Sequence, residues 1–407
     1  MQKACECVRI IIFFGGCSKF IDYWPNLCGS VLSLASKKQI ENTKMIIVGV
    51  GDIMPGGLLS ETNRSCVSND VKRILLQGDI RVGTLECALG NSPNYDLDKV
   101  ADRGNVIYAK ENDIKRLKEL HIDIVSLANN HFFDLGVDGA RRTIEILDRE
   151  GIMHCGAGDN IKDACKPVVI EQNGKSYAFL GFCDTEYHHV YWCTYATEDQ
   201  PGVNPMIEAH VVSVIQSAKK KYDYVIVLAH WGTENTFFPN LSTYKIACKM
   251  LKAGASLILG SHPHQIQPVV NTKLGCIAYS MGNFLFPERL IAPPKVTYYP
   301  DNPLDYDTLP VTDGYPLVDR ITLKTLPFLA RVGMIVVAEL KDGLIRYHYK
   351  LSYLGKNNVL GLLDDKNNVL LEKKIHTIAI PLRFNMYSAF LLCKRSIGYI
   401  NRKIIRK

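Results

Sequence analysis

The sequence predicts an α/β fold in which helices cover a mainly parallel β-sheet. From Lys44 onward, short apolar runs rich in β-branched residues alternate with stretches of helical periodicity, a pattern typical of such folds. A hydrophobic fraction of 47% and a charged fraction of 22% over 407 residues indicate a soluble globular protein. Polar residues of metal-binding type directly follow several of the apolar runs.

Seven apolar runs have the length of buried strands. They span residues 44–50, 81–85, 123–127, 177–182, 224–228, 256–259 and 275–279. Between them, apolar residues spaced three and four apart predict helices over residues 114–120, 137–147, 207–218 and 241–251. Gly151 and Gly254 follow two of these helices, where glycine commonly ends a helix because it adopts the left-handed conformation without strain.

This alternation defines one main domain over residues 44–355. Residues 1–43 form an N-terminal extension whose short apolar run, at 10–16, is at most a degenerate signal or anchor. Residues 291–317 contain six prolines and no period, which predicts a long irregular excursion in a position to rim a site. Residues 330–351 then predict a closing β-hairpin.

The positive charge is concentrated at the C-terminus. Residues 373–407 hold nine basic and no acidic side chains, so with a net charge of +7 the remainder of the chain is slightly acidic. Because the folded body lacks a basic surface excess and a base-reading motif, we expect no nucleic-acid partner. The basic tail predicts contact with an anionic membrane surface or an acidic partner, with a solvated, frayed terminus as the alternative.

Five segments that carry metal-ligand residue types follow predicted strands. They are G-D-I-M-P-G (51–56), T-L-E (84–86), A-N-N-H (128–131), H-W-G-T-E (230–234) and G-S-H-P-H (260–264). In open α/β sheets, the carboxyl ends of the strands meet at one edge, where ligands bind. Each segment alone has an ordinary explanation as a turn, a cap or a satisfied core histidine. Five in one chain favour a shared metal site.

The side chains in these segments suggest a divalent ion. The candidate ligands are Asp52, Glu86, Asn130, His230, His262 and His264. His262 and His264 flank a proline, and alternate side chains of an extended segment point in related directions. Such a mixed set suits Mn, Zn or Fe, with one or two ions per chain. Trp231 is predicted as a wall of the pocket, and Glu234 as a partner of a ligand histidine.

Taken in order, these motifs resemble the CapA family of bacterial poly-γ-glutamate capsule synthesis proteins. The resemblance covers residues 45–286 and includes L-A-N-N-H-F-F-D-L-G-V-D-G, G-A-G-D-N and Y-S-M-G-N-F-L-F besides the five segments above. It implies a calcineurin-like metallophosphoesterase sandwich, in which two packed mixed β-sheets are flanked by helices. It also implies a role in making, exporting or attaching an anionic envelope polymer.

The resemblance also assigns roles by position. It makes Asp52 the first carboxylate, Glu86 the bridging acid, Asn130 and His131 the N-H pair, His230 the next ligand, and His262 and His264 the closing pair. His131 is then the catalytic residue, which donates a proton to the leaving group. Asn129 and Asn283, from the same motifs, are expected to support the ligands or contact the substrate.

Three positions depart from the pattern. Met54 stands where dinuclear phosphoesterases carry the histidine of a D-x-H motif, which leaves one metal short of a ligand. Thr84 replaces the asparagine of N-L-E, and Ser261 replaces the residue that often precedes H-P-H. Neither of these two changes removes a proposed ligand.

Two functions follow from the motifs and the resemblance. The first is a metal-dependent hydrolase that cleaves a phosphoester or a γ-amide bond in an envelope polymer or its precursor. The second is a non-catalytic, metal-binding accessory or scaffold subunit of a polymer synthase complex at the membrane. The resemblance implies a membrane-associated protein of the bacterial envelope, whereas thirteen scattered cysteines favour a reducing compartment and keep the cytoplasm as the alternative.

Overall fold

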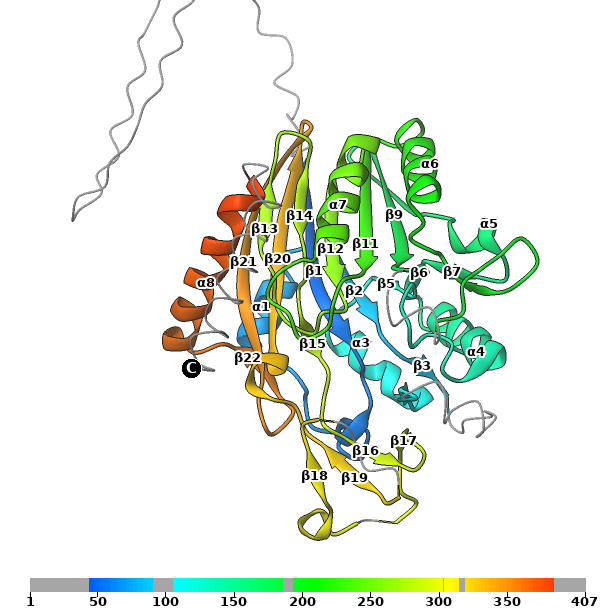
Figure 1. Ribbon diagram of the computed structural model, residues 1–407, viewed down its shortest axis with the longest axis vertical. Coiled ribbons are helices and arrows are strands. Elements are labelled where there is room, and N and C mark those ends of the chain that lie inside the picture. Colours follow the sequence, from blue (N-terminus) through cyan, green and yellow to red (C-terminus); the bar gives the residue numbers. More distant parts are fainter. Residues whose placement is uncertain (1–43, 91–104, 186–192, 303, 315–318, 384–407) are drawn as a thin grey trace, which may run out of the picture. The chain divides into compact units, whose positions relative to one another are not determined.

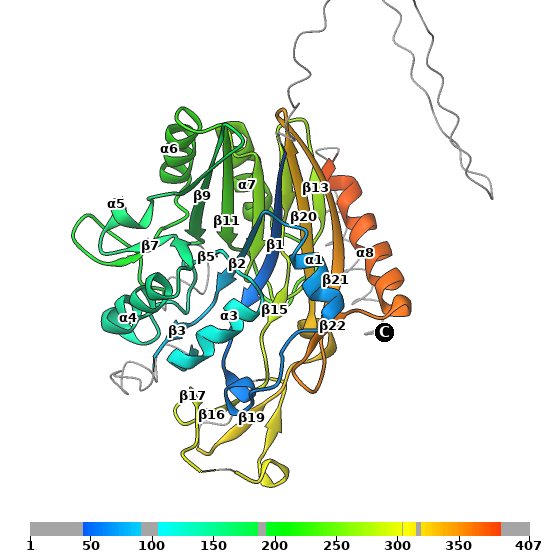
Figure 2. The ribbon, with the colours of Figure 1, turned by 180° about the vertical axis from the view of Figure 1, so that it is seen from behind.

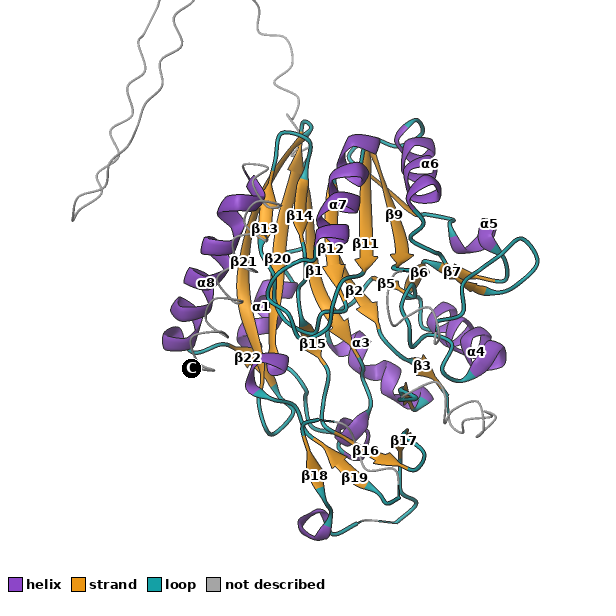
Figure 3. Ribbon diagram, viewed as in Figure 1, coloured by secondary structure: helices purple, strands orange, loops and turns teal. Residues whose placement is uncertain are grey.

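A computed structural model describes residues 44–90, 105–185, 193–302, 304–314 and 319–383 (Figure 1). The predicted N-terminal extension and residues 384–407 of the predicted tail lie outside the described residues, as do positions 303 and 315–317 of the predicted excursion. Two mixed β-sheets pack face to face in the remainder, with helices on their outer sides (Figure 3). The α/β sandwich implied by the resemblance is therefore confirmed.

The first sheet has the order β22-β21-β20-β1-β2-β5-β6, and β15 adds to β1. Its centre is parallel, and the hairpin of β20 and β21 joins β1 in the antiparallel sense, as the closing-hairpin prediction requires. The strands are β1 (Met45–Ile53), β2 (Ile80–Leu85), β5 (Ile124–Ser126), β6 (Met153–Cys155), β15 (Asn283–Leu285), β20 (Val332–Lys341), β21 (Leu344–Leu354) and β22 (Leu360–Leu362).

The second sheet has the order β13-β14-β12-β11-β9-β8, parallel in its centre and antiparallel at both edges. The strands are β8 (Val168–Gln172), β9 (Lys175–Cys183), β11 (Tyr224–His230), β12 (Leu257–Ser261), β13 (Val269–Asn271) and β14 (Cys276–Ala278). All seven predicted strands occur, and most of the unpredicted ones are edge strands of three to five residues. Runs that short carry too little periodicity to identify.

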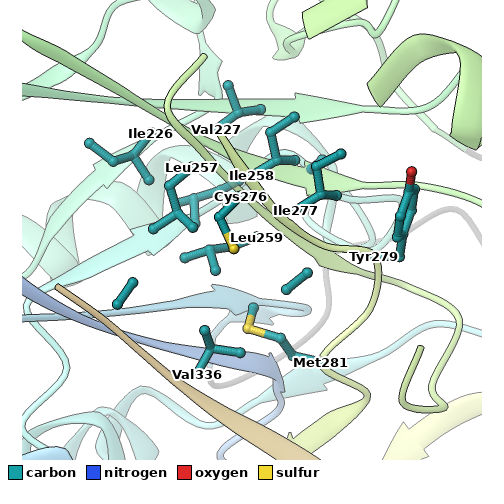
Figure 4. Packing of buried hydrophobic residues seen from close by; sticks show 14 of the residues in the cluster. Ile226, Val227, Leu257, Ile258, Leu259, Cys276, Ile277, Tyr279, Met281 and Val336 are labelled. Carbon is teal, nitrogen blue, oxygen red and sulfur yellow. The ribbon is translucent and has the colours of Figure 1, made fainter. Parts of the chain in front are cut away.

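The two sheets make contact where β1 crosses β12. A Cβ atom added at Gly49 would lie 2.7 Å from Leu259 Cδ1, so the absence of a side chain permits this approach. Figure 4 shows Leu259 beside Met281 and Val336 in the same buried cluster. Each fully buried aliphatic side chain contributes roughly 1.5 to 3 kcal/mol to folding, so this seam fixes how the strand ends of the two sheets face one another.

Helices cover the sandwich from outside (Figure 2). They are α1 (Asn69–Leu75), α3 (Lys115–Glu119), α4 (Gly136–Arg149), α5 (Ile161–Ala164), α6 (Glu208–Lys219), α7 (Leu241–Ala253) and α8 (Asp365–Arg383). The predicted stops are confirmed, because Gly254 caps α7 at φ 116° and Gly151 follows α4 at φ 72°. At the other end of α7, Asn240 Oδ1 accepts a 2.7 Å hydrogen bond from Thr243 N, which satisfies a donor of the first turn.

The structure corrects two organisational predictions. Short strands of a four-stranded sheet, β17-β16-β19-β18, interrupt the excursion at 291–317, most of whose described residues lie outside strands and helices; the sheet is at the bottom of Figure 1. Residues 373–383 belong to α8, whose buried face includes Leu371, Ile375, Ile378 and Leu382, so a frayed terminus is wrong for that stretch.

Within the described chain, no helix has both the length and the apolar character to cross a membrane. The small sheet comprises β16 (Arg289–Ala292), β17 (Val296–Tyr298), β18 (Val311–Thr312) and β19 (Thr322–Lys324).

Candidate metal centre

The ligand-type side chains converge at the carboxyl ends of the parallel strands of both sheets. Asp52 lies near the end of β1 and pairs with Asn283 of β15. A Cβ atom at Gly51 would lie 1.7 Å from Gly282 O, so only glycine permits this pairing and places the next residue, Asp52, inside. Glu86 directly follows β2, and His230 ends β11. The sandwich seam thus brings one carboxylate pair and one imidazole to the same buried point.

The nitrogen and oxygen atoms of this cluster lie close to one another. His230 Nε2 is 3.5 Å from Glu86 Oε1 and 2.8 Å from Asn130 Oδ1, and its Nδ1 is 3.8 Å from Asp52 Oδ1. His264 Nε2 is 3.6 Å from Glu86 Oε1. Six of the seven residues predicted to share a metal site are therefore brought together: Asp52, Glu86, Asn130, His230, His262 and His264.

The two carboxylates are buried without ordinary partners. Asp52 and Glu86 are both 0% exposed, and Asp52 Oδ1 and both Glu86 oxygens accept no hydrogen bond from the described part of the chain. Burial raises the pKa of Asp52 to about 6, although the nearby His264 and hydrogen bonds from His262 and Ser261 lower it. Burial also raises the pKa of Glu86 well above its usual range, and the charge of Asp52 raises it further.

The backbone of the H-P-H segment differs from the prediction. His262 and His264 have φ values of 92° and 52°, so they occupy left-handed conformations in a bend and do not alternate along an extended segment. Non-glycine residues adopt such values at a cost of roughly 1 to 3 kcal/mol, and they cluster at functional sites. The bend lets His262 N donate a 3.1 Å hydrogen bond to Asp52 Oδ2 while both rings face the carboxylates.

Asn283 determines the tautomer of His264. The amide nitrogen of Asn283 donates to Ala330 O at 2.8 Å, so its Oδ1 remains as an acceptor 2.8 Å from His264 Nδ1. His264 Nδ1 must therefore carry the proton, which leaves the lone pair of Nε2 directed at Glu86. This arrangement is typical of a metal-ligating histidine, with Asn283 hydrogen-bonded to the nitrogen that faces away from the Glu86 carboxylate.

Two of the departures from the family pattern contact each other. Ser261 Oγ lies 3.0 Å from Thr84 Oγ1 and 3.0 Å from His230 Nδ1. The two hydroxyls therefore fix the orientation of the His230 ring through Nδ1, while Nε2 faces Glu86 and Asn130. The sequence prediction noted both substitutions but did not foresee this hydrogen-bond chain.

His131 lies beside the cluster and is held by a partner that the sequence analysis missed. Its Nδ1 is 2.7 Å from Asp134 Oδ2, and its side chain is 16% exposed. The neighbouring Asn129 accepts a 3.0 Å hydrogen bond from His131 N and donates to Leu85 O at 2.8 Å, which ties the turn to the end of β2. The spacing of His131 and Asp134 within N-N-H-F-F-D was the available signal for this pair.

Three other residues of the motifs have the following surroundings. Trp231 is 0% exposed and donates a 2.7 Å hydrogen bond to Tyr279 O, so it packs in the core beside the end of β11. Glu234 is exposed, and no hydrogen bond joins it to a described histidine; its charge instead raises the pKa of Glu86. Met54 is fully buried, with Sδ 3.3 Å from Gly56 N, so its sulfur is engaged within its own loop.

The donor set fits a divalent ion. Asp52, Glu86 and His230 offer ligand atoms within 4.8 Å of one another, and so do Glu86, His262 and His264. Two atoms that each lie about 2.1 Å from one ion are separated by roughly 3 to 3.5 Å, close to the separations seen here. Oxygen and imidazole donors suit Mn, Zn or Fe. A surface hollow of about 520 Å³, lined by Arg141, His154, Asp159 and Lys166, contains none of these ligands.

Comparison with known proteins identifies related chains. The model of the family described as bacterial capsule synthesis protein PGA_cap matches residues 46–288. The chain is 35% identical over 264 residues to the capsule biosynthesis protein CapA of Bacillus anthracis, covering 62% of this chain and 62% of the relative. It is 32% identical over 242 residues to the PGA biosynthesis protein CapA of Bacillus subtilis, covering 58% of this chain and 62% of that relative. The chain thus spans about three fifths of the length of these curated relatives.

Among solved structures, the chain is similar to a putative 5'-nucleotidase from Staphylococcus aureus, solved in complex with alpha-ketoglutarate. The TM-score is 0.45 at 12% identity, over 82% of this chain and 58% of that one. At this level of similarity, the fold assignment rests on the strand order of the two sheets.

Proposed function

The chain belongs to the bacterial capsule synthesis protein PGA_cap family, as its motifs predicted, and from this premise we propose that it is a metal-dependent hydrolase. Its substrate would be a phosphoester or γ-amide bond in a poly-γ-glutamate-type envelope polymer or its precursor. The single observation that carries the proposal is the buried carboxylate pair of Asp52 and Glu86. Asp52 Oδ1 and both oxygens of Glu86 accept no hydrogen bond from described residues, although imidazole nitrogens lie 3.8 Å from Asp52 Oδ1 and 3.5 Å and 3.6 Å from Glu86 Oε1.

The residues that would hold the ion are Asp52, Glu86, Asn130, His230, His262 and His264. A bound divalent ion would supply Lewis acidity and would lower the pKa of a water molecule at the site. The protein itself contributes orientation, because Asn283 and Ser261 fix the imidazole rings of His264 and His230. The seam between the sheets excludes bulk water from both carboxylates, which are 0% exposed.

His131 would donate the proton that the leaving group requires. Its Nδ1 contacts Asp134, so Nε2 is the nitrogen available for proton transfer. Its partial exposure leaves the ring accessible to a substrate. Asp134 is therefore a positioning residue for His131.

The test is turnover by protein loaded with Mn, Zn or Fe, assayed on a model phosphoester and on a γ-glutamyl peptide. His131→Ala should lower the rate by roughly 100-fold to 10,000-fold. His154→Ala is a matched control, because His154 also pairs with an aspartate, Asp148, at 3.1 Å. His154 does not belong to the ligand cluster and lines a separate surface hollow. Equal turnover by the wild type and His131→Ala on both substrates would end the hydrolase proposal.

A second candidate is a scaffold subunit of a polymer synthase that binds a metal without turnover. It is favoured by Met54, whose sulfur contacts Gly56 N at a position where related phosphoesterases place a ligand histidine. Polymer production in cells separates the candidates. If production survives His131→Ala but is lost when the chain is truncated after residue 383, the scaffold is correct. Truncation at this point spares α8, which packs in the core.

We further propose an anionic membrane surface as a partner. The outer side of α8 combines exposed apolar and basic residues: Lys366, Val369, Leu370, Lys373 and Ile380. Such a stripe favours the boundary between lipid headgroups and acyl chains. Cosedimentation with anionic vesicles, but not with zwitterionic vesicles, should weaken in a Lys366→Glu/Lys373→Glu variant. Equal cosedimentation with both vesicle types would exclude an electrostatic membrane partner.

A further inference from the structure

Arg289, the first residue of β16, is buried without a counterion among the described residues. Its side chain is 4% exposed, and Arg289 Nε has no acceptor among the described residues. No carboxylate of the described chain lies within ion-pair distance of its guanidinium group. A buried charge that lacks both a hydrogen-bond partner and a counterion is strongly unfavourable, because the group has lost its hydration without replacement. Such a group requires an explanation.

Arg331 is a second buried arginine, and here the fold supplies both hydrogen-bond acceptors and a counterion. Arg331 is also 4% exposed, but its Nε donates to Leu326 O at 2.9 Å. Its Nη1 lies 3.4 Å from Leu354 O, and its Nη2 forms an ion pair with Glu288. Glu288 directly precedes Arg289 in sequence, so two arginines with equal exposure share one region. Only Arg331 has its charge compensated by described residues.

Arg289 lies close to the metal centre. Its guanidinium carbon is 5.3 Å from the ring centroid of Phe286, and His264 makes an edge contact with the same ring, at a centroid distance of 5.5 Å. The segment from Asn283 to Arg289 therefore carries both the residue that orients a ligand histidine and the unpaired cation.

The charge of Arg289 persists at neutral pH. Burial lowers its pKa to about 10, and the nearby Tyr299, Glu86 and Cys87 oppose this change. Glu86 is the carboxylate that acts on Arg289 most directly from the centre, but its charge would be shared with a bound cation. The guanidinium group would then retain an uncompensated positive charge beside the site. A guanidinium group pairs best with a planar or tetrahedral oxyanion, which it binds with two parallel hydrogen bonds.

We propose that Arg289 binds the oxyanion group of the substrate that enters the metal centre, a phosphate or a carboxylate. This inference rests on the hydrolase proposal for the identity of the site, but not on turnover. It assigns to the small sheet β17-β16-β19-β18 the function of carrying a substrate-recognition residue near the metal centre. The alternative is a structural role in which Arg289 only packs on Phe286.

Stability measurements distinguish the two roles. If Arg289 awaits an anion, Arg289→Met should leave the melting temperature unchanged or raise it, because an uncompensated charge is removed. Arg331→Met is the matched control and should lower the melting temperature, because it leaves Glu288 and several carbonyl groups unpaired. A lower melting temperature in Arg289→Met, comparable with that of Arg331→Met, would show that Arg289 is a structural residue and would overturn the proposal.

Anion binding is measured by calorimetry on the full chain with Mn present, using inorganic phosphate and glutarate as separate probes. The wild type should bind at least one of them, and Arg289→Met should bind it about 10-fold to 100-fold more weakly. Arg289→Lys should recover part of the affinity, since it keeps the charge but loses the bidentate geometry. Arg331→Met, where it remains folded, should bind as the wild type does.

Each outcome separates this inference from the hydrolase proposal. Binding of phosphate alone identifies a phosphorylated substrate, and binding of glutarate alone identifies a carboxylate-bearing one; both results support the proposal when Arg289→Met weakens them. If the wild type binds an oxyanion through Arg289 but hydrolyses nothing, the hydrolase proposal fails and the recognition site stands. Wild type and Arg289→Met binding both probes equally, or neither protein binding either probe, would reject the role of Arg289.

Discussion

Two buried clusters of charged residues in this protein differ in how far the chain itself satisfies them. At the metal centre, Asp52 and Glu86 have three carboxylate oxygens that accept no hydrogen bond from described residues. Around α3, Arg116 is also only 3% exposed, but its Nη1 donates to Arg64 O at 2.7 Å and its Nη2 to Leu59 O at 3.1 Å. Its partner Glu119 lies 3.2 Å away. We name these residues, with Ser65, Cys66 and Lys72, the α3 charge cluster.

The titration of the carboxylates reflects this difference. Burial raises the pKa of Glu119, but hydrogen bonds from Ser65, Cys66 and Arg116 outweigh it and bring the pKa down to about 2. At the metal centre, burial dominates and raises the pKa of Asp52 to about 6. The same residue class is thus stabilised as an anion in one place and destabilised in the other. The α3 charge cluster pairs its charges internally, although Arg116 Nε has no acceptor among the described residues, whereas the charges of the metal centre are balanced only with a cation.

The largest expected effect comes from breaking the α3 charge cluster. Arg116→Met should lower the free energy of unfolding by roughly 3 to 5 kcal/mol, because Glu119 and several carbonyl groups lose a buried partner. Urea denaturation of the metal-free protein measures this. Metal affinity should not change, since no residue of the α3 charge cluster belongs to the ligand set. A loss of metal binding in folded Arg116→Met would show that the two clusters are coupled.

The next effect comes from neutralising the carboxylates of the metal centre. With Mn or Zn at about 100 times the dissociation constant, the wild type should gain roughly 2.7 kcal/mol of stability. An Asp52→Asn/Glu86→Gln variant should lose this gain, while its metal-free form should be no less stable than the wild type, because two unfavourable buried charges are absent. Thermal unfolding with and without metal tests both statements. A metal-dependent gain that persists in the variant would place the ion elsewhere.

The pH dependence of stability should have opposite sign in the two clusters. The raised pKa of Asp52 means that the folded state binds the extra proton, so this contribution to stability is present at low pH and is lost as pH rises through about 6. The lowered pKa of Glu119 gives stability that is present above its ordinary value and is lost as pH falls toward about 2. Urea titrations of the metal-free protein from about pH 3 to about pH 8 measure both contributions.

Two variants isolate those slopes. Asp52→Asn should flatten the change near pH 6, and saturating Mn should flatten it equally, because the cation replaces the proton. Glu119→Gln should flatten only the acid limb. A wild-type stability that increases from pH 6 upward in the absence of metal, with a slope removed by Asp52→Asn, would contradict the sign assigned here.

The smallest effect concerns an exposed pair and defines the limit of the comparison. Arg320 lies 2.8 Å from Asp319, and both side chains are more than half exposed, at 63% and 57%. Because water screens such a pair, Arg320→Ala should leave the free energy of unfolding unchanged within the error of the measurement. Burial, and not the presence of an opposite charge, would then be what distinguishes the clusters. A measurable loss in urea denaturation would require the pair to have a structural role.

Local sequence patterns predicted the strands and several site residues because both depend on neighbouring positions. The apolar run before Asp52 and the turn around Asn130 and His131 each carry their own signal, and the motif order added the family. The same reasoning failed at His262 and His264, whose left-handed backbone depends on contact with Asp52 from β1. It also missed the small sheet, because strands of two to four residues take their stability from pairing with distant segments.

By itself, the sequence determined the residue types that could ligate a metal, the strand ends that carry them and the α/β class. Tertiary structure alone decided that Ser261 orients His230, that Asn283 orients His264, and that Arg289 is buried with no counterion in the described part of the chain. The physical reason is the distance along the chain over which each effect acts. Periodicity and turn chemistry act over a few residues, whereas hydrogen-bond satisfaction and desolvation depend on atoms that only the packing of the two sheets brings together.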